Sequence, residues 1–139
     1  MSLHVLDTDT LSLLQENHLK VVARVATCPP ENIAVTIISV EEQLSGWYRR
    51  LRRSRKPEEL AKIYESLTRT VRSLAQLPIF SFDEASIHRA RRLQAQKLNV
   101  RKMDLCIAAI ALEHQASIVT RNVRDFGRVP GLSVEDWSK

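Results

Sequence analysis

Two aspartates separated by one residue follow a short apolar segment near the start of the chain. The segment 3–6 (LHVL) favours a β-strand, and Asp7-Thr8-Asp9-Thr10 comes directly after it. Each of these four polar side chains could cap the helix that the spacing of the following leucines predicts. Two carboxylates this close also repel each other, and a bound cation would relieve that repulsion. Asp7 and Asp9 are therefore candidates for a helix cap and for a cation site.

A further acid follows the next predicted strand. Residues 33–40 (IAVTIISV) form a β-branched and nearly continuous apolar run, which is typical of a parallel strand covered on both faces. Glu41 and Glu42 come next and are expected to open a helix. Ser39 and Glu42 have the spacing of a capping box, so Glu42 could serve helix capping or chemistry.

The segment 103–112 (MDLCIAAIAL) carries one charge, Asp104, at the head of an apolar run. A helix that is apolar on every side is a buried helix, and ten residues are too few to span a bilayer. We therefore expect a central core helix that begins with an acid. Asp104 could cap this helix or hold a cation at the rim of a site.

A fourth acid, Asp125, lies in a polar loop or short turn at 120–126, after a strand predicted at 117–120 (SIVT). Further short strands are expected at 79–82 and 132–134, and further helices at 57–74 and after Asp83. Strands that alternate with helices predict an α/β fold in which a parallel sheet has helices on both faces. The sequence contains no repeat or linker, so we expect residues 1–139 to form one domain.

The four acids are predicted to converge at one edge of this sheet. Sites in parallel α/β sheets form outside the carboxyl ends of the strands, where Asp7, Glu42 and Asp125 are expected. Asp104 is placed there by the start of its helix. Clustered carboxylates suit Mg²⁺ or Mn²⁺, and a rim of cations would hold a nucleic acid backbone. The pattern predicts metal-assisted phosphodiester hydrolysis. The basic residues expected around this edge are Arg101, Lys102, Arg121, Arg124 and Arg128.

The overall composition favours a polyanionic partner. The net charge is +5, and the stretch 49–56 (RRLRRSRK) holds six basic residues, among them Arg52, Arg53 and Arg55. This stretch is interpreted as a phosphate-binding edge or as a solvated helix face. The two cysteines form no CxxC pair, which argues against a zinc site and a disulfide framework. No signal peptide or membrane span is evident, so we expect a cytoplasmic protein.

The motifs together resemble those of PIN-domain ribonucleases of the VapC toxin type. The resemblance extends almost end to end and rests on the blocks LDTDTL, SVEEQLSG, MDLCIAAIAL, VTRNVRDF and VPGLSVEDW. It implies a PIN-like three-layer α/β/α sandwich with a central, mainly parallel sheet, and a metal-dependent endoribonuclease. The four acids of the family correspond to Asp7, Glu42, Asp104 and Asp125.

The resemblance also assigns roles around these acids. Mg²⁺ or Mn²⁺ is expected on Asp7, Asp104 and Asp125, and the expected partners are RNA, a VapB-like antitoxin and a second copy in a homodimer. The supporting residues are Asp9, Thr120 and Asn122, and the expected RNA-binding residues are Arg52, Arg53, Arg55, Arg101, Lys102, Arg121 and Arg124. The chain departs from the family at Gln43, where Leu is usual. It departs again at Arg101-Lys102-Met103, where Gly or Pro is frequent.

Two other interpretations remain open from the sequence. Asp7-Thr8-Asp9 also resembles the opening motif of haloacid dehalogenase-type phosphatases, in which the first acid is a nucleophile and the second a general acid. That family prefers Thr or Val where Leu11 stands. The other alternative is a non-catalytic module that binds RNA or protein through the basic segments, with the acids acting as helix caps.

Overall fold

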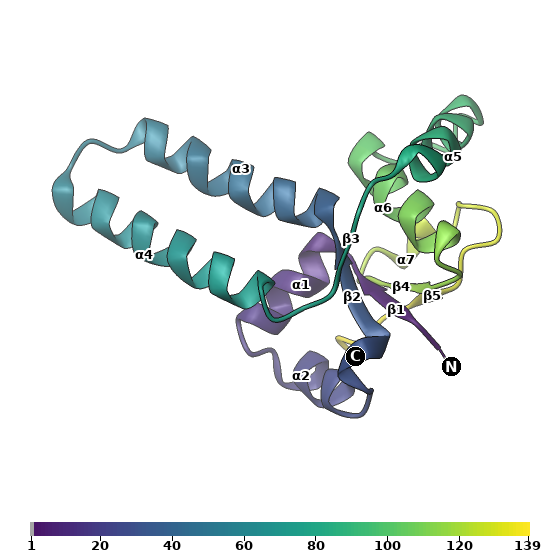
Figure 1. Ribbon diagram of the computed structural model, residues 1–139, viewed down its shortest axis with the longest axis horizontal. Coiled ribbons are helices and arrows are strands. Elements are labelled where there is room, and N and C mark those ends of the chain that lie inside the picture. The colour runs from purple at the N-terminus through teal and green to yellow at the C-terminus, as the bar shows by residue number, and fades with distance from the viewer. Residues whose placement is uncertain (1) are drawn as a thin grey trace.

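A parallel sheet forms the centre of the molecule. The computed structural model describes residues 2–139, within which five strands pair in the order β3-β2-β1-β4-β5, every pair parallel (Figure 1). On the central strand, Val5 is in register with Ala34 on one side and Ile118 on the other. The predicted α/β class is confirmed. The strands are β1 (His4–Leu6), β2 (Ile33–Thr36), β3 (Ile79–Phe80), β4 (Ser117–Val119) and β5 (Val134–Glu135).

Helices connect the strands and cover both faces of the sheet. Among residues 2–139, no helix is long and apolar enough to cross a membrane. The α-helices are α1 (Thr8–Gln15), α2 (Leu19–Ala26), α3 (Ile37–Arg53), α4 (Pro57–Leu74), α5 (Glu84–Ala95), α6 (Lys102–Glu113) and α7 (Val123–Phe126), with a short 3₁₀ turn, η1 (Pro30–Asn32), before β2.

Alternation along the strands produces two hydrophobic cores, one on each face of the sheet. Val5 and Ile118 point into the core formed with α5 and α6, whereas Leu6 and Val119 point into the core that includes Leu11 of α1. Successive side chains on a strand face opposite sides, so each buried strand must be apolar throughout. The two cores define the three layers of an α/β/α sandwich.

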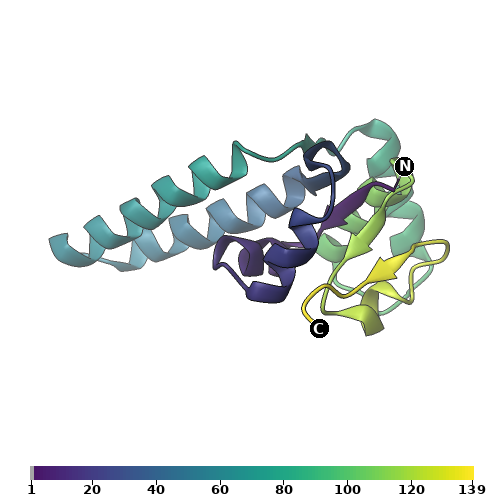
Figure 2. The ribbon, with the colours of Figure 1, turned by 90° about the horizontal axis from the view of Figure 1, so that it is seen from below.

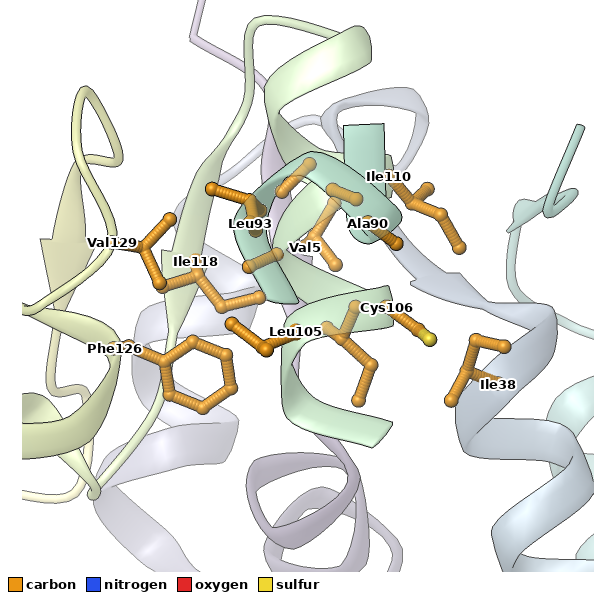
Figure 3. Packing of buried hydrophobic residues seen from close by; sticks show 14 of the residues in the cluster. Val5, Ile38, Ala90, Leu93, Leu105, Cys106, Ile110, Ile118, Phe126 and Val129 are labelled. Carbon is orange, nitrogen blue, oxygen red and sulfur yellow. The ribbon is translucent and has the colours of Figure 1, made fainter. Parts of the chain in front are cut away.

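Helix α6 is the centre of the larger core, as the sequence predicts. Residues 107–111 of this helix are fully buried. Figure 3 shows Leu105 and Ile110 of α6 packed among side chains from the sheet and from α5. The burial of α6 fixes the position of its first turn, and therefore of Asp104, against the carboxyl edge of the sheet.

Helices α3 and α4 pack side by side and project from the sheet as an arm (Figures 1 and 2). The indole Nε1 of Trp47 on α3 donates to Thr70 Oγ1 on α4 at 2.9 Å. The arm ends at residues 54–56, between the two helices. Its tip carries most of the basic stretch 49–56, at the end of the arm that lies away from the sheet.

Several predicted boundaries were wrong. The second strand ends at Thr36, and residues 37–40 form the first turn of α3. Thr36 accepts a hydrogen bond from the Ser39 amide at 3.2 Å and is therefore the N-cap. The composition explains the error, because a short apolar run can form either a strand or a helix segment. The strands expected at 79–82 and 132–134 are shorter or shifted, and the loop at 120–126 contains helix α7.

We expect Trp137→Ala to lower the free energy of unfolding by about 3–5 kcal/mol, because it empties a fully buried site. Trp137 is 1% exposed and packs in the core that contains Leu6 and Leu11. Urea unfolding measures the loss. The control, Tyr64→Ala, removes a side chain from a residue that is 56% exposed and should change stability by about 0.5 kcal/mol or less. Equal losses in the two variants would contradict the assignment of Trp137 to the core.

Candidate active site

Asp7 caps a helix and also faces a cavity. It is the N-cap of α1, where its Oδ1 accepts from the Thr10 amide at 2.8 Å. Its Oδ2 accepts from the Thr120 hydroxyl at 2.6 Å. Burial raises the pKa of Asp7, and the hydrogen bonds from Thr120 and Thr10 oppose the increase. Capping and a place in the site are therefore compatible at this residue.

Glu42 reaches the same region from α3, although it does not form the predicted capping box. It lies in the second turn of a helix whose N-cap is Thr36. The Thr8 hydroxyl donates to Glu42 Oε1 at 2.6 Å and lies 2.8 Å from Ser39 Oγ. These contacts tie α3 to α1 beside Asp7. The capping interpretation of Glu42 is wrong, and its carboxylate is held by side chains of the candidate site.

Asp104 is the third residue of α6, and the N-cap of this helix is Arg101. The capping interpretation of Asp104 is therefore wrong. Its carboxylate instead accepts from the Arg101 guanidinium, with Nη2 at 3.0 Å from Oδ1 and Nε at 3.3 Å from Oδ2. The same Nη2 lies 3.4 Å from Glu42 Oε2. The pKa of Arg101 is raised, first by its hydrogen bonds with Asp104.

Asp7 and Asp104 line one cavity of about 450 Å³ outside the carboxyl end of β1. Asp7 is 5% exposed and Asp104 is 8% exposed. Asp9 lies at the rim, where both of its oxygens accept hydrogen bonds from Arg121, at 2.7 and 2.9 Å. The walls of the cavity consist of Asp7, Thr8, Asp9, Arg101, Asp104, Arg121 and Asn122.

Asp125 lies apart from this cavity. It lines a neighbouring cavity of about 490 Å³, and Arg101 borders both. Asn122 Nδ2 donates to Asp125 Oδ2 at 2.9 Å, and Arg128 Nη1 donates to Oδ1 at 3.0 Å. Within residues 2–139, no three His, Cys, Asp or Glu side chains lie close enough to hold a metal ion together. The structure places Asp7 and Asp104 on one cavity and Asp125 on the neighbouring one.

The predicted basic residues fall into two groups. Arg101 and Arg121 line the cavity with Asp7, and Arg124 lines the cavity with Asp125. Lys102 is exposed at the first residue of α6. In contrast, Arg52 and Arg53 are near the tip of the arm, and Arg53 is 11 residues beyond Glu42, or about 16 Å along the helix axis. Arg55 lies in the connection between α3 and α4.

Sequence analysis missed two kinds of contact in the site. Thr8 bridges to Glu42 and Ser39, and Arg101 pairs with Asp104 and Glu42 rather than standing free. The adjacency of Thr8 to Asp7 and the i,i+3 spacing of Arg101 and Asp104 were the available signals. Neither signal could reveal the contact with Glu42, because that contact joins segments 34 to 59 residues apart.

The fold and the cavity define a parallel α/β protein whose carboxylates gather, with an arginine rim, outside the central strand. Such an arrangement can hold a divalent cation beside a phosphate. The PIN domain family model matches residues 5–132. The chain belongs to the PIN domain family.

Relatives with assigned names match along nearly the whole chain. Ribonuclease VapC1 of Haemophilus influenzae is 28% identical over 142 residues, covering 99% of both chains. The tRNA(fMet)-specific endonuclease VapC of Salmonella typhimurium is 25% identical over 137 residues, covering 96% of both.

Solved structures share the fold. A toxin–antitoxin complex from Klebsiella pneumoniae contains a chain that is 25% identical, with a TM-score of 0.70, covering 93% of this chain and 94% of that one. DNA-bound VapBC from Salmonella typhimurium has a TM-score of 0.74 at 23% identity, covering 99% of both chains. These matches agree with the predicted PIN-like sandwich.

We expect Asp7→Asn to raise the free energy of unfolding at neutral pH in buffer that contains EDTA. Because burial raises the folded-state pKa of Asp7, the ionised carboxylate destabilises the fold above that pKa, and a neutral amide removes the penalty. The amide can still accept from Thr10 and donate to the Thr120 hydroxyl. Urea unfolding as a function of pH measures the difference, which should shrink through the raised pKa and vanish below about 3.8, the ordinary aspartate value.

The control for this measurement is Asp7→Ala, which also removes the charge but leaves the α1 N-cap without an acceptor. We expect it to be about 1 kcal/mol less stable than the Asn variant at every pH. A stability difference between Asp7→Asn and wild type that stays constant across this pH range would contradict the buried, destabilising carboxylate.

Proposed function

We propose that the chain is a metal-dependent endoribonuclease and the toxin of a type II toxin–antitoxin pair. The observation that carries the proposal is the cavity in which the buried acids Asp7 and Asp104 meet Arg101 and Arg121. Carboxylates at such a place can bind a cation, and arginines at the rim can hold a phosphodiester beside it. The names of the relatives, ribonuclease and endonuclease, agree with this chemistry.

The donors in the cavity fit Mg²⁺ or Mn²⁺. The candidate ligands are oxygens, and Mg²⁺ is commonly bound by one or two carboxylates while it keeps several waters. Asp7 and Asp104 are the residues that would hold the ion, and Asp125 would join them only after its contacts with Asn122 and Arg128 rearrange. A bound cation would activate a water as nucleophile and stabilise charge on the phosphodiester.

The chain's own residues supply positioning. Thr120 and the Thr10 amide fix the Asp7 carboxylate, and Thr8 fixes Glu42. Glu42 then lies beside the cavity, and its carboxylate can accept a proton from the attacking water. Arg121, whose guanidinium forms two bonds to Asp9, is held at the rim for contact with the RNA backbone.

Protein partners are part of the proposal. The related chain from Klebsiella pneumoniae was solved as a toxin–antitoxin complex, which supports a VapB-like antitoxin here. Large apolar side chains are exposed on the arm: Tyr48, Tyr64 and Val71 are 47%, 56% and 51% exposed. Exposed apolar surface of this kind suits contact with another protein chain. A homodimer is proposed together with the antitoxin complex.

The two alternatives are less well supported. In a haloacid dehalogenase-type phosphatase, Asp9 would be the general acid, but both of its oxygens accept hydrogen bonds from Arg121. The PIN family match gives that alternative no support. A non-catalytic module would explain the basic segments but gives no reason for two buried acids, Asp7 and Asp104, to line one cavity together.

We expect Asp104→Asn to reduce RNA cleavage by at least about 100-fold, because loss of a direct metal ligand should exceed the 10–100-fold cost of losing an outer partner. The assay incubates purified protein with a mixed panel of tRNA, rRNA and mRNA, in Mg²⁺, in Mn²⁺ or in EDTA. Wild type should cut in metal only, and Asp7→Asn should behave like Asp104→Asn.

The matched control for the cleavage assay is Asp83→Asn. Asp83 caps α5 through the Ser86 amide at 2.9 Å, and asparagine is an equally good cap, so fold and activity should be retained. Cleavage that persists in EDTA or in both site variants would contradict the proposed function. RNA binding without cutting by the wild type would favour the non-catalytic module.

We expect replacement of Arg52, Arg53 and Arg55 by Gln to weaken RNA binding and to flatten its salt dependence. If all three contact phosphates, the slope of log K against log salt should fall in magnitude by about 2 for a single strand. Fluorescence anisotropy at several salt concentrations measures the slope. The control replaces Arg91, Arg92 and Lys97, three exposed cations on or after α5. An equal change of the salt slope in the control would show that the arm tip has no specific role in RNA binding.

A further inference from the structure

Arg101 bonds two of the proposed site carboxylates with one guanidinium group. Its Nη2 lies 3.0 Å from Asp104 Oδ1 and 3.4 Å from Glu42 Oε2, and its Nε lies 3.3 Å from Asp104 Oδ2. The Asp104 and Glu42 side chains are 12% and 17% exposed, whereas the Arg101 side chain is 64% exposed. The arginine therefore covers the two acids from the solvent side.

Helix stability does not account for an arginine at this position. Arg101 is the N-cap of α6 and Lys102 follows it, at the end of a helix where the dipole disfavours positive charge. Favoured N-cap side chains accept an amide hydrogen bond, and a guanidinium carries donors only. An exposed ion pair contributes about 0–1 kcal/mol. The contacts with Asp104 and Glu42 are what this arginine contributes to the site.

Arg101 also lies between the two cavities. It lines the cavity that contains Asp7 and Asp104, and it lines the cavity that contains Asp125. Its withdrawal would remove the positive charge from Asp104 and change the lining of both cavities.

A divalent cation held by Asp7 and Asp104 would need the Asp104 oxygens that the Arg101 guanidinium contacts. Both oxygens of Asp104 accept from Arg101, and the Thr8 hydroxyl takes the other oxygen of Glu42. A cation bound through the carboxylate oxygens would lie next to the guanidinium, and two neighbouring positive charges repel each other. Asp104 therefore cannot hold the metal and Arg101 at the same time.

We propose that Arg101 is the resident counter-ion of Asp104 and Glu42 and must be displaced from Asp104 before a divalent cation binds. The arginine thus sets the cation concentration at which the site fills. Once released, its guanidinium lies at the rim of the cavity, where its planar fork suits a phosphate. The physiological meaning of this competition rests on the proposed nuclease function. The competition between Arg101 and a cation for Asp104 can be measured without RNA.

The test is a Mn²⁺ titration of the full chain without RNA, in which electron paramagnetic resonance reports the free ion. Arg101→Gln should bind Mn²⁺ on the order of 5-fold more tightly than wild type, which is the lower end of the range for coupled binding events. Arg101→Lys keeps the positive charge but lacks the planar guanidinium. Its Mn²⁺ affinity should lie between those of wild type and Arg101→Gln. Half-saturating Mn²⁺ for RNA cleavage should shift in the same direction.

The matched control is Arg91→Gln, which removes one positive charge from an exposed residue of α5 outside the site. Screening limits its effect to about 2-fold or less. Mn²⁺ affinity in Arg101→Gln that equals or falls below that of the folded wild type overturns the proposal, as does an equal gain in Arg91→Gln. If no variant binds Mn²⁺, the competition is also rejected, and cleavage by the wild type then decides separately whether the nuclease function stands.

Discussion

Compensation of negative charge at one edge of the sheet is the constraint on which the rest of the site depends. Each carboxylate there has a different partner. Asp7 is held by a helix amide and the Thr120 hydroxyl, whereas Asp104 is held by Arg101. Asp9 pairs with Arg121. Because burial strengthens repulsion between like charges, no acid can enter this edge without such a partner. The partner side chains therefore stabilise the carboxylates at this edge of the sheet.

The topology delivers these partners from distant parts of the chain. β1 lies between β2 and β4, so the segments that follow these strands meet at one edge. Asp7 and Thr120 are 113 residues apart in sequence but lie next to each other, because their strands pair in register. The apolar helix α6 adds Asp104 to this edge. Packing of the buried residues of α6 in the core fixes the position of the first turn of the helix. Core packing and site geometry are thus one arrangement.

Arginine has two different tasks in this protein. At the edge of the sheet, Arg101 and Arg121 neutralise carboxylates and rim the cavity. Arg52 and Arg53 are in the last turn of α3, at the end of the arm that lies away from the sheet (Figure 1). The net charge of +5 does not separate these groups. A charge that balances a neighbouring acid contributes little to attraction of a polyanion, whereas an exposed cluster contributes fully.

The residue pattern alone was enough to predict the α/β class and the buried helix α6, because hydrophobic periodicity is a local property of a sequence. Belonging to the PIN family agrees with that reading. The end of β2 at Thr36 could not be predicted in this way, since a short apolar run can form either a strand or the first turn of a helix. The pairing of Arg101 with Glu42, and the separation of Asp125 from Asp7 and Asp104, also depended on the folded chain. These contacts join side chains of distant segments, and their geometry follows from how the helices pack on the sheet.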